Sequence, residues 1–159
     1  MLLAKVETVT FDEASQMGII LLNVDDRTLP IWVGLFEAQA ILLKLQNSSF
    51  PRPLTHDLLR NCIEKLGGKV EYVFINDIIK GTFYAQIHIS LKGERIIMDS
   101  RPSDAIALAV RVNVPIYIDE KVFESGSVDR EEFLEQQKEK LYRAYLESLG
   151  DDEIGKLKH

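Results

Sequence analysis

The sequence predicts an α+β fold in which helices pack against a largely antiparallel or mixed sheet. Three observations support this prediction. Segments with alternating apolar and polar residues are typical of strands, lysine-glycine pairs join neighbouring strands as hairpin turns, and other segments carry apolar residues at helical spacing. The chain has 159 residues, of which 46% are hydrophobic and 28% charged, and this size and composition suit one domain with a substantial core.

The first part of the chain predicts three strands and a helix. Residues 3–11 and 18–24 have the composition of strands, and the second segment is too apolar for a surface position. Residues 28–34 continue as a third strand, in which Pro30 indicates an edge, a bulge or a strand beginning. Apolar residues at helical spacing then predict a helix over 35–46.

A proline-containing stretch separates this helix from the next one. Pro51 and Pro53 lack backbone donors and favour extended geometry at the preceding residues, so they end the first helix. We expect Thr55 to cap a second helix over 56–66, with Asp57 in its first turn stabilised by the helix dipole. A glycine pair directly after this helix ends it.

Three further strands are predicted over 69–79, 82–91 and 94–99. The middle strand alternates cleanly, so its apolar residues share one face and its polar residues the other. His88 falls on the polar face, where we expect a solvated or interface histidine rather than a ligand. A third helix is then predicted over 102–112.

The last part of the chain predicts a short strand and a long helix. The strand covers 115–119, where the sequence is PIYID. Asp129 and Glu132 have the spacing of a capping box, and the amphipathic helix that follows them runs to about residue 149. We expect this helix to serve in packing or in oligomer formation.

An internal repeat of βββα type is one interpretation of the pattern. A shift of 67 positions superposes residues 19–44 on residues 86–111 without a gap, and Glu37 then coincides with Asp104 at the start of a helix. Because identities are few, chance is the other interpretation. A true repeat would place two carboxylates at equivalent helix starts.

Charge and hydropathy limit the classes of partner. The net charge of −6 argues against a general nucleic-acid binder, although residues 44–111 carry ten basic side chains against seven acidic ones. The N-terminus lacks the pattern of a signal peptide, and no stretch approaches the roughly 18 consecutive apolar residues of a membrane span. We therefore expect a cytoplasmic protein that does not enter a membrane. A single cysteine excludes an internal disulfide and a cysteine-based zinc site within the chain.

Three stretches carry an unusual density of polar residues, and each lies where an extended segment gives way to a helix. They are residues 29–38, 50–59 and 99–109. Helix N-termini present free N–H groups and partial positive charge, which suit phosphate and other anions. Asp99 and Asp104 lie on either side of the third transition, and carboxylates that converge there would be the ligands that a hard divalent cation requires.

Other residues of these stretches complete a candidate site. Glu37 is a candidate third oxygen ligand, and His56 with Asp57 can orient or activate a water molecule. Arg52 and Arg101 are suited to bind phosphate through paired hydrogen bonds. These stretches therefore contain the residue types of a phosphate-directed reaction.

A purely structural interpretation accounts for the same residues. Ser103 is a good helix cap, and Asp104 is a favourable anion in a first helical turn. Arg101 can simply pair with Asp99. Trp32 is expected in the core or in an interface rather than as a platform for base stacking. On the residues alone, we favour the structural interpretation over catalysis.

The stretches LPIWVG followed by Glu37, PRPLTHDLL and DSRPSDAIALA occur together and in the order of the bifunctional nuclease domain family, which the sequence resembles over about residues 3–125. This resemblance implies an α+β domain that forms a homo-oligomer, and a nuclease activity on DNA and RNA. It favours nine positions as functional residues, namely Glu37, Arg52, Thr55, His56, Asp57, Asp99, Arg101, Ser103 and Asp104.

With the resemblance, the hypothesis is a phosphodiesterase that acts on DNA or RNA with the help of Mg²⁺ or Mn²⁺. The expected catalytic residues are His56, Asp57, Glu37 and Asp104. The expected metal ligands are Asp99, Asp104 and Glu37. The residues expected to bind the substrate are Arg52, Arg101, Thr55 and Ser103.

The alternative hypothesis is a non-enzymatic regulatory or binding module. Such a module would be homo-oligomeric, and its polar turns would be structural or would bind an anion. Under either hypothesis we expect residues 1–125 to form the domain that resembles the family and residues 126–159 to form a C-terminal helical extension.

Overall fold

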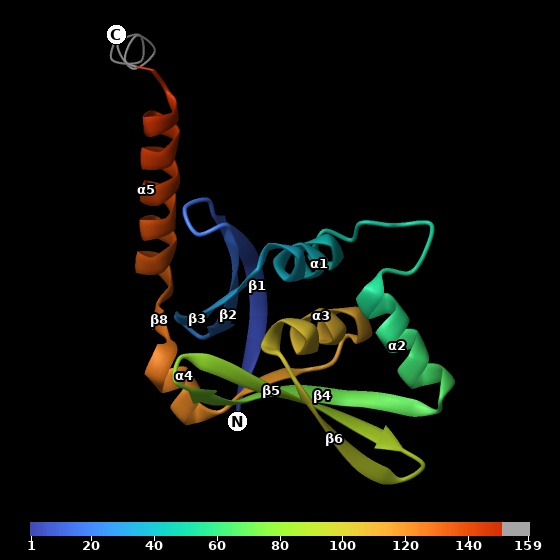
Figure 1. Ribbon diagram of the computed structural model, residues 1–159. Helices are drawn as coiled ribbons and strands as arrows, with labels where there is room; N and C mark the ends of the chain where they lie inside the picture. Colours follow the sequence, from blue (N-terminus) through green and yellow to red (C-terminus); the bar gives the residue numbers. More distant parts are fainter. Residues whose placement is uncertain (151–159) are drawn as a thin grey trace.

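The computed structural model of the chain describes residues 1–150, which form an eight-stranded sheet and five helices (Figure 1). The strands are β1 (Leu2–Asp12), β2 (Met17–Val24), β3 (Arg27–Gly34), β4 (Gly68–Ile79), β5 (Thr82–Leu91), β6 (Glu94–Ser100), β7 (Ile116–Ile118) and β8 (Val128–Asp129). The helices are α1 (Leu35–Leu45), α2 (Thr55–Lys65), α3 (Pro102–Val112), α4 (Glu120–Gly126) and α5 (Arg130–Ser148).

The sheet is mixed, with the strand order β6-β5-β4-β7-β1-β2-β3-β8. β1, β2 and β3 form one antiparallel meander, and β4, β5 and β6 form another. The short strand β7 joins the two, because it pairs antiparallel with β1 and parallel with β4. The predicted α+β class is therefore confirmed. Each meander leads into a helix, α1 or α3, whereas the internal repeat stays a prediction.

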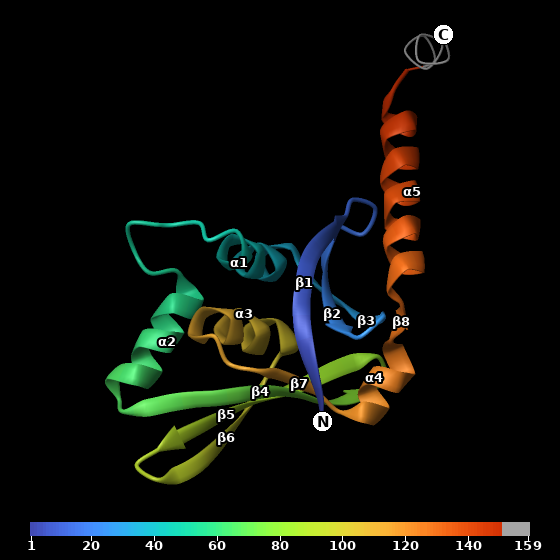
Figure 2. The same ribbon diagram turned by 180° about the vertical axis from the view of Figure 1, so that it is seen from behind.

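Helices α1, α2 and α3 lie on the same face of the sheet (Figures 1 and 2). α3 contacts α1, α2, β4 and β5, so it is the central helix of this layer. Its residues 105–109 are buried, as are residues 19–22 of β2. Burial of each such leucine or isoleucine stabilises the fold by about 1.5–3 kcal/mol. The start of α3, where the polar residues gather, is thus fixed by the core behind it.

Strand β5 follows the predicted alternation. Ala85, Ile87 and Ile89 are buried on the face that α3 covers. His88 points to the opposite face, yet it is only 6% exposed because its ring stacks on Tyr72, with 4.2 Å between the ring centroids. A neighbouring aromatic ring covers His88, so the expectation of a solvated histidine is wrong, whereas the expectation of an interface histidine stays a prediction.

Other local features also differ from the prediction. Trp32 is 42% exposed, so the expected place in the core is wrong, whereas the expected place in an interface stays a prediction. Thr55 is the first residue of α2 rather than its cap, and Leu54 takes the capping position. The backbone amide of Leu54 donates instead to the carboxylate of Asp57 at 2.9 Å. The sequence pattern also did not predict α4 and β8.

Helix α5 begins as predicted and projects away from the rest of the molecule (Figures 1 and 2). The side chain of Asp129 accepts a hydrogen bond from the amide of Glu132 at 2.9 Å, which confirms the cap. The helix has no buried residue, and Leu141 and Tyr145 on its apolar side are 61% and 55% exposed. Residues 151–159 of the predicted extension lie outside the described residues.

Within residues 1–150, none of the helices combines the length and the apolar character needed to cross a lipid bilayer.

Candidate active site

The candidate site lies where α1, α2 and α3 begin. Each helix follows a residue with extended backbone, and each carries a carboxylate in its first turn, namely Glu37, Asp57 and Asp104. A helix N-terminus carries about half a unit of positive charge, so neighbouring helix starts favour anions. Glu37 and Asp104 meet at the side chain of Arg101, and Asp57 lies in a separate network.

Arg101 joins the first turns of α1 and α3. Its Nε donates to Oδ2 of Asp104 at 2.9 Å, and its Nη2 donates to Oδ1 of the same carboxylate at 3.3 Å. Its Nη1 donates to Oε1 of Glu37 at 3.2 Å. The side chain of Arg101 is 63% exposed, so the guanidinium also faces solvent. One cation is thus held between two carboxylates and remains accessible to a ligand.

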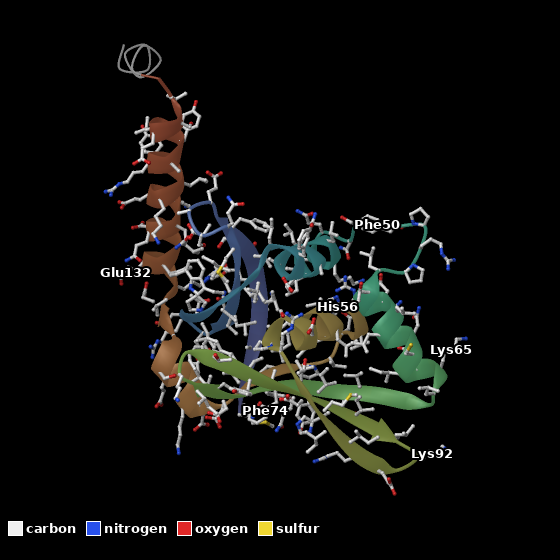
Figure 3. All side chains as sticks on the ribbon, in the orientation of Figure 1. Phe50, His56, Lys65, Phe74, Lys92 and Glu132 are labelled. Carbon is white, nitrogen blue, oxygen red and sulfur yellow. The ribbon has the colours of Figure 1, made fainter. Side chains whose placement is uncertain are left out.

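His56 links α2 to the same cluster. Its Nε2 lies 2.9 Å from Oδ1 of Asp104, and its side chain is only 13% exposed. Figure 3 shows His56 between α2 and α3. A carboxylate at this distance fixes the orientation of the imidazole and the position of its proton. His56 and Asp104 therefore have the geometry of an acid–base pair, although 48 positions separate them in the chain.

The charges of the cluster stabilise one another. Burial alone would raise the pKa of Asp104, but the hydrogen bonds from Arg101 and His56 and the charge of Arg101 outweigh it, so the pKa lies below its ordinary value. The hydrogen bond with Asp104 raises the pKa of Arg101, and Glu37 adds to this effect. Asp104 is consequently an anion and Arg101 a cation near neutral pH.

Gly34, the last residue of β3, leaves room for the Glu37 side chain. A Cβ atom added at Gly34 would collide with the carboxylate of Glu37. The backbone of Gly34 has φ −61° and ψ 156°, which any residue can adopt. A larger residue at this position would thus displace the carboxylate of Glu37 without straining the backbone.

Asp57 belongs to a different network, which is built around Arg111. The Arg111 side chain is 2% exposed, and its Nε donates to Oδ1 of Asp57 at 3.0 Å. Its other nitrogens donate to the carbonyl of Ala107 at 2.8 Å and to the carbonyl of Ala40 at 3.0 Å. Asp57 thus has structural partners and does not contact the cluster of His56.

Asp99 does not join the cluster. It is exposed on β6 and pairs in register with Gln86 of β5. Strand alternation puts these two residues on the face that carries His88, opposite the face that α3 covers. The expected convergence of Asp99 with Asp104 is therefore not found.

The residues expected to bind the substrate are dispersed around the cluster. Thr55 is exposed and lines the same hollow as His56. Arg52 is exposed in an adjoining hollow, and Ser103 lines another although it is only 5% exposed. The structure brings Arg101 and Thr55 to the hollow of the cluster and places the other two beside it.

Three of the four carboxylate oxygens of Glu37 and Asp104 already accept hydrogen bonds from protein donors. Asp104 accepts hydrogen bonds from Arg101 on both oxygens, and Glu37 accepts one from the same guanidinium. Within residues 1–150, no three histidine, cysteine, aspartate or glutamate side chains are arranged to hold a metal ion. Since Mg²⁺ and Mn²⁺ require several converging oxygen ligands, the residues present do not fit the predicted metal ion.

The cluster lines a hollow of about 630 Å³ between α1, α2 and α3. Phe36 also lines this hollow, and it is 80% exposed.

The sequence analysis did not select Phe36 or Arg111 as residues of the site. An exposed aromatic residue beside Glu37 has no sequence signature of its own. An arginine in the otherwise aliphatic helix 102–112 was a signal that could have been used.

Comparison with known proteins identifies a family model that covers most of the chain. The model of the bifunctional nuclease domain matches residues 19–131. This range contains every residue of the cluster and of the Asp57–Arg111 network.

Several relatives match a large part of the chain. An uncharacterized protein of Mycobacterium tuberculosis is 40% identical over 142 residues, which cover 81% of this chain and 82% of that protein. Bifunctional nuclease 1 of Oryza sativa subsp. indica is 31% identical over 116 residues, which cover 70% of this chain and 35% of that protein. Bifunctional nuclease 2 of Arabidopsis thaliana is 27% identical over 126 residues, which cover 70% of this chain and 38% of that protein. The matched region is thus little more than a third of each plant protein.

Proposed function

Because the chain belongs to the bifunctional nuclease domain family, we propose that it is a nuclease that cleaves phosphodiester bonds at the cluster of His56, Asp104 and Arg101. The observation that carries this proposal is the hydrogen-bonded chain from His56 through Asp104 to Arg101. It combines a proton acceptor, a group that orients it and an accessible cation.

His56 is the proposed general base. Asp104 engages Nε2, so Nδ1 is the ring nitrogen that would take the proton from an attacking hydroxyl group or water. The carboxylate of Asp104 would stabilise the imidazolium that results. In this assignment Asp104 orients His56 and does not itself react.

Arg101 is the proposed electrophilic group. Its guanidinium is 63% exposed, and the partial positive charges of three helix starts support the binding of a phosphate beside it. The bond to Glu37, at 3.2 Å, is the contact that a phosphate oxygen would replace. When the attacking oxygen bonds to phosphorus and the P–O bond to the leaving oxygen breaks, the proton that His56 has taken up would pass to the leaving oxygen, and the released Glu37 carboxylate could accept and relay it. The proposed reaction has no step through a metal ion.

The test is cleavage of labelled single-stranded DNA, double-stranded DNA and RNA by the purified chain. We expect His56→Ala and Asp104→Asn to lower kcat by about 10²- to 10⁴-fold, the range for removal of general acid–base catalysis. Glu64→Gln, an exposed change on the same helix as His56, is the matched control and should retain full activity.

Two outcomes would contradict the proposal. An equal cleavage rate in His56→Ala and in the wild type would assign the activity to a contaminating nuclease. No cleavage by the wild type, together with a lower melting temperature in both variants, would favour the non-enzymatic binding module.

Two further expectations also remain proposals. We propose that the chain acts in the cytoplasm, as expected from the pattern of its N-terminus, and that it forms a homo-oligomer, as the resemblance implies. Light scattering at several protein concentrations tests the second expectation, and a mass equal to one chain throughout would refute it.

A further inference from the structure

Three hollows adjoin along the starts of α1, α2 and α3. The central hollow, of about 630 Å³, contains His56 and Arg101. A second hollow, of about 330 Å³, shares Glu37 and Arg101 with it. A third, of about 340 Å³, shares Leu43 and Leu54 with the central one. We call these three adjoining hollows the site groove.

Each hollow of the site groove is lined by one exposed aromatic side chain. Phe36 lies in the central hollow and is 80% exposed, Trp32 lies in the second and is 42% exposed, and Phe50 lies in the third and is 47% exposed. Figure 3 shows Phe50 on the loop that precedes α2. Large apolar side chains gathered along one groove indicate a surface that is covered by a ligand or a partner.

Positive charge gathers at one end of the groove, whereas in the central hollow Arg101 lies with the carboxylates of Glu37 and Asp104. Arg101 is shared by the central and second hollows, and the third hollow is lined by Lys44, Arg52 and Arg60. The whole chain has a net charge of −6, so its overall field does not attract a polyanion. Affinity for nucleic acid would therefore have to come from local contacts in the groove.

We propose that the site groove binds single-stranded nucleic acid, with bases stacked on Phe36 and Trp32 and with phosphates at the basic side chains. This proposal rests on the proposed nuclease function and names the class of its substrate. In a duplex both faces of each base are already stacked on neighbouring bases, so the exposed aromatic rings add no affinity for a duplex. An unpaired strand offers free base faces, and each base that stacks on an aromatic ring adds affinity.

The charge of the third hollow supports this ligand over an apolar one. Three basic side chains at one end and a row of aromatic rings are the two features that single-strand binding surfaces combine. The rival is a second copy of this chain that covers Phe36 and Trp32. A second copy would cover the exposed rings and would change the mass of the chain in solution, so light scattering distinguishes it from nucleic acid.

The experiment measures fluorescence anisotropy of a labelled strand of about 12 nucleotides, a length within the range of single-strand sites. All variants carry His56→Ala, so that binding is measured without turnover. A duplex of the same sequence is titrated in parallel. We expect the single strand to bind at least about tenfold more tightly than the duplex, and Phe36→Ala to weaken single-strand binding by about 5- to 150-fold.

Two variants separate stacking from general apolarity. Phe36→Trp keeps a ring and should retain most of the single-strand affinity, whereas Phe36→Leu keeps only apolar bulk and should behave like Phe36→Ala. Tyr142→Ala on α5 is the control for loss of an exposed aromatic side chain, because Tyr142 is 64% exposed and lies outside the groove. It should leave binding unchanged.

The proposal is overturned by equal affinity for strand and duplex, or by full affinity in Phe36→Leu. It is also overturned if Phe36→Ala leaves affinity intact but changes the mass measured by light scattering, because the groove would then be an interface between copies. A wild type that cleaves nucleic acid without preference for single strands retains the proposed function and loses only this inference. If the wild type neither binds nor cleaves nucleic acid, both the proposed function and this inference are contradicted.

Discussion

The buried guanidinium of Arg111 donates to the carboxylate of Asp57 at 3.0 Å and so ties the last turn of α3 to the first turn of α2. Arg111 also donates to a carbonyl of α1, so one side chain connects the three helices whose starts form the site. Burial alone would raise the pKa of Asp57, but hydrogen bonds from Leu54 and Arg111 and the charge of Arg111 outweigh it and lower the pKa.

We predict that Asp57→Asn destabilises the fold. Removing the carboxylate beside the buried Arg111 leaves an uncompensated charge, which costs up to about 3–5 kcal/mol, with the 25% exposure of Asp57 favouring the lower values. For a chain of this size the melting temperature should fall by roughly 6–20 °C. Calorimetry checks this, with the exposed Glu64→Gln on the same helix as the control. An unchanged melting temperature combined with lost cleavage would instead restore the catalytic role expected from the sequence.

Arg101→Gln should lower kcat by about 10²- to 10³-fold, as expected for loss of a group that stabilises charge in the transition state. The melting temperature should change little, because exposed ion pairs contribute about 0–1 kcal/mol. Arg95→Gln, an exposed arginine of β6, is the control in the same cleavage assay. Parallel losses of activity and stability in Arg101→Gln would mean that Arg101 is structural.

Gly34→Ala should impair activity without unfolding the chain. The added methyl group would push Glu37 away from Arg101, and displacement of about 1 Å at a site can cost up to about 10²-fold in rate. Gly93→Ala should instead lower stability and leave activity unchanged. Gly93 has φ 79° in open space, so alanine there strains the backbone by about 1–2 kcal/mol and leaves the cleavage rate unchanged.

Chelation should leave cleavage intact. Within residues 1–150 the carboxylates do not form a metal site, and the cation beside Asp104 is a guanidinium. We expect the same initial rate in EDTA as in Mg²⁺ or Mn²⁺, and the same rate in Asp99→Asn. A rate that disappears in EDTA and is restored by Mn²⁺, together with an inactive Asp99→Asn, would show that the ligand set expected from the sequence forms when substrate binds.

His88 should make stability depend on pH. Burial lowers its pKa, and the charge of Arg95 lowers it further. Below about pH 6.5 the unfolded chain takes up a proton at this histidine while the folded chain does not, so the free energy of unfolding falls. The loss continues until the pH reaches the lowered pKa of the folded state. Urea denaturation at pH 7.5 and about pH 5.5 measures it, and His88→Gln should have a smaller difference than the wild type.

The regular elements could be predicted because their signals are local. β5 and α3 have the bounds that alternation and helical spacing predict, since one face of each packs on the core. α4 could not be predicted, because it has seven residues and is held by contacts from Asp119 and by the burial of Phe123. β8 is two residues long and exists only through pairing with β3.

The site could be predicted in part. The sequence selected the three helix starts, because polar residues next to aliphatic helices are unusual. The sequence could not predict which of these side chains pair, because the hydrogen bonds His56–Asp104 and Asp57–Arg111 both depend on how α2 packs on α3. The expected convergence of Asp99 with Asp104 is not found because pairing with β5 turns Asp99 to the other face of the sheet, and β6 has apolar residues on both faces, so its sequence does not indicate this orientation.

Arg101 directly follows β6, which is the outermost strand at one end of the sheet. Among residues 1–150, β6 pairs only with β5, so the segment that carries the guanidinium is held from one side. Local opening of an edge strand needs far less free energy than global unfolding. Fraying of β6 would loosen the backbone that leads into Arg101, although Arg101 and Asp104 both remain at the start of α3. Amide exchange along residues 94–100 measures how often the strand beside the cluster opens.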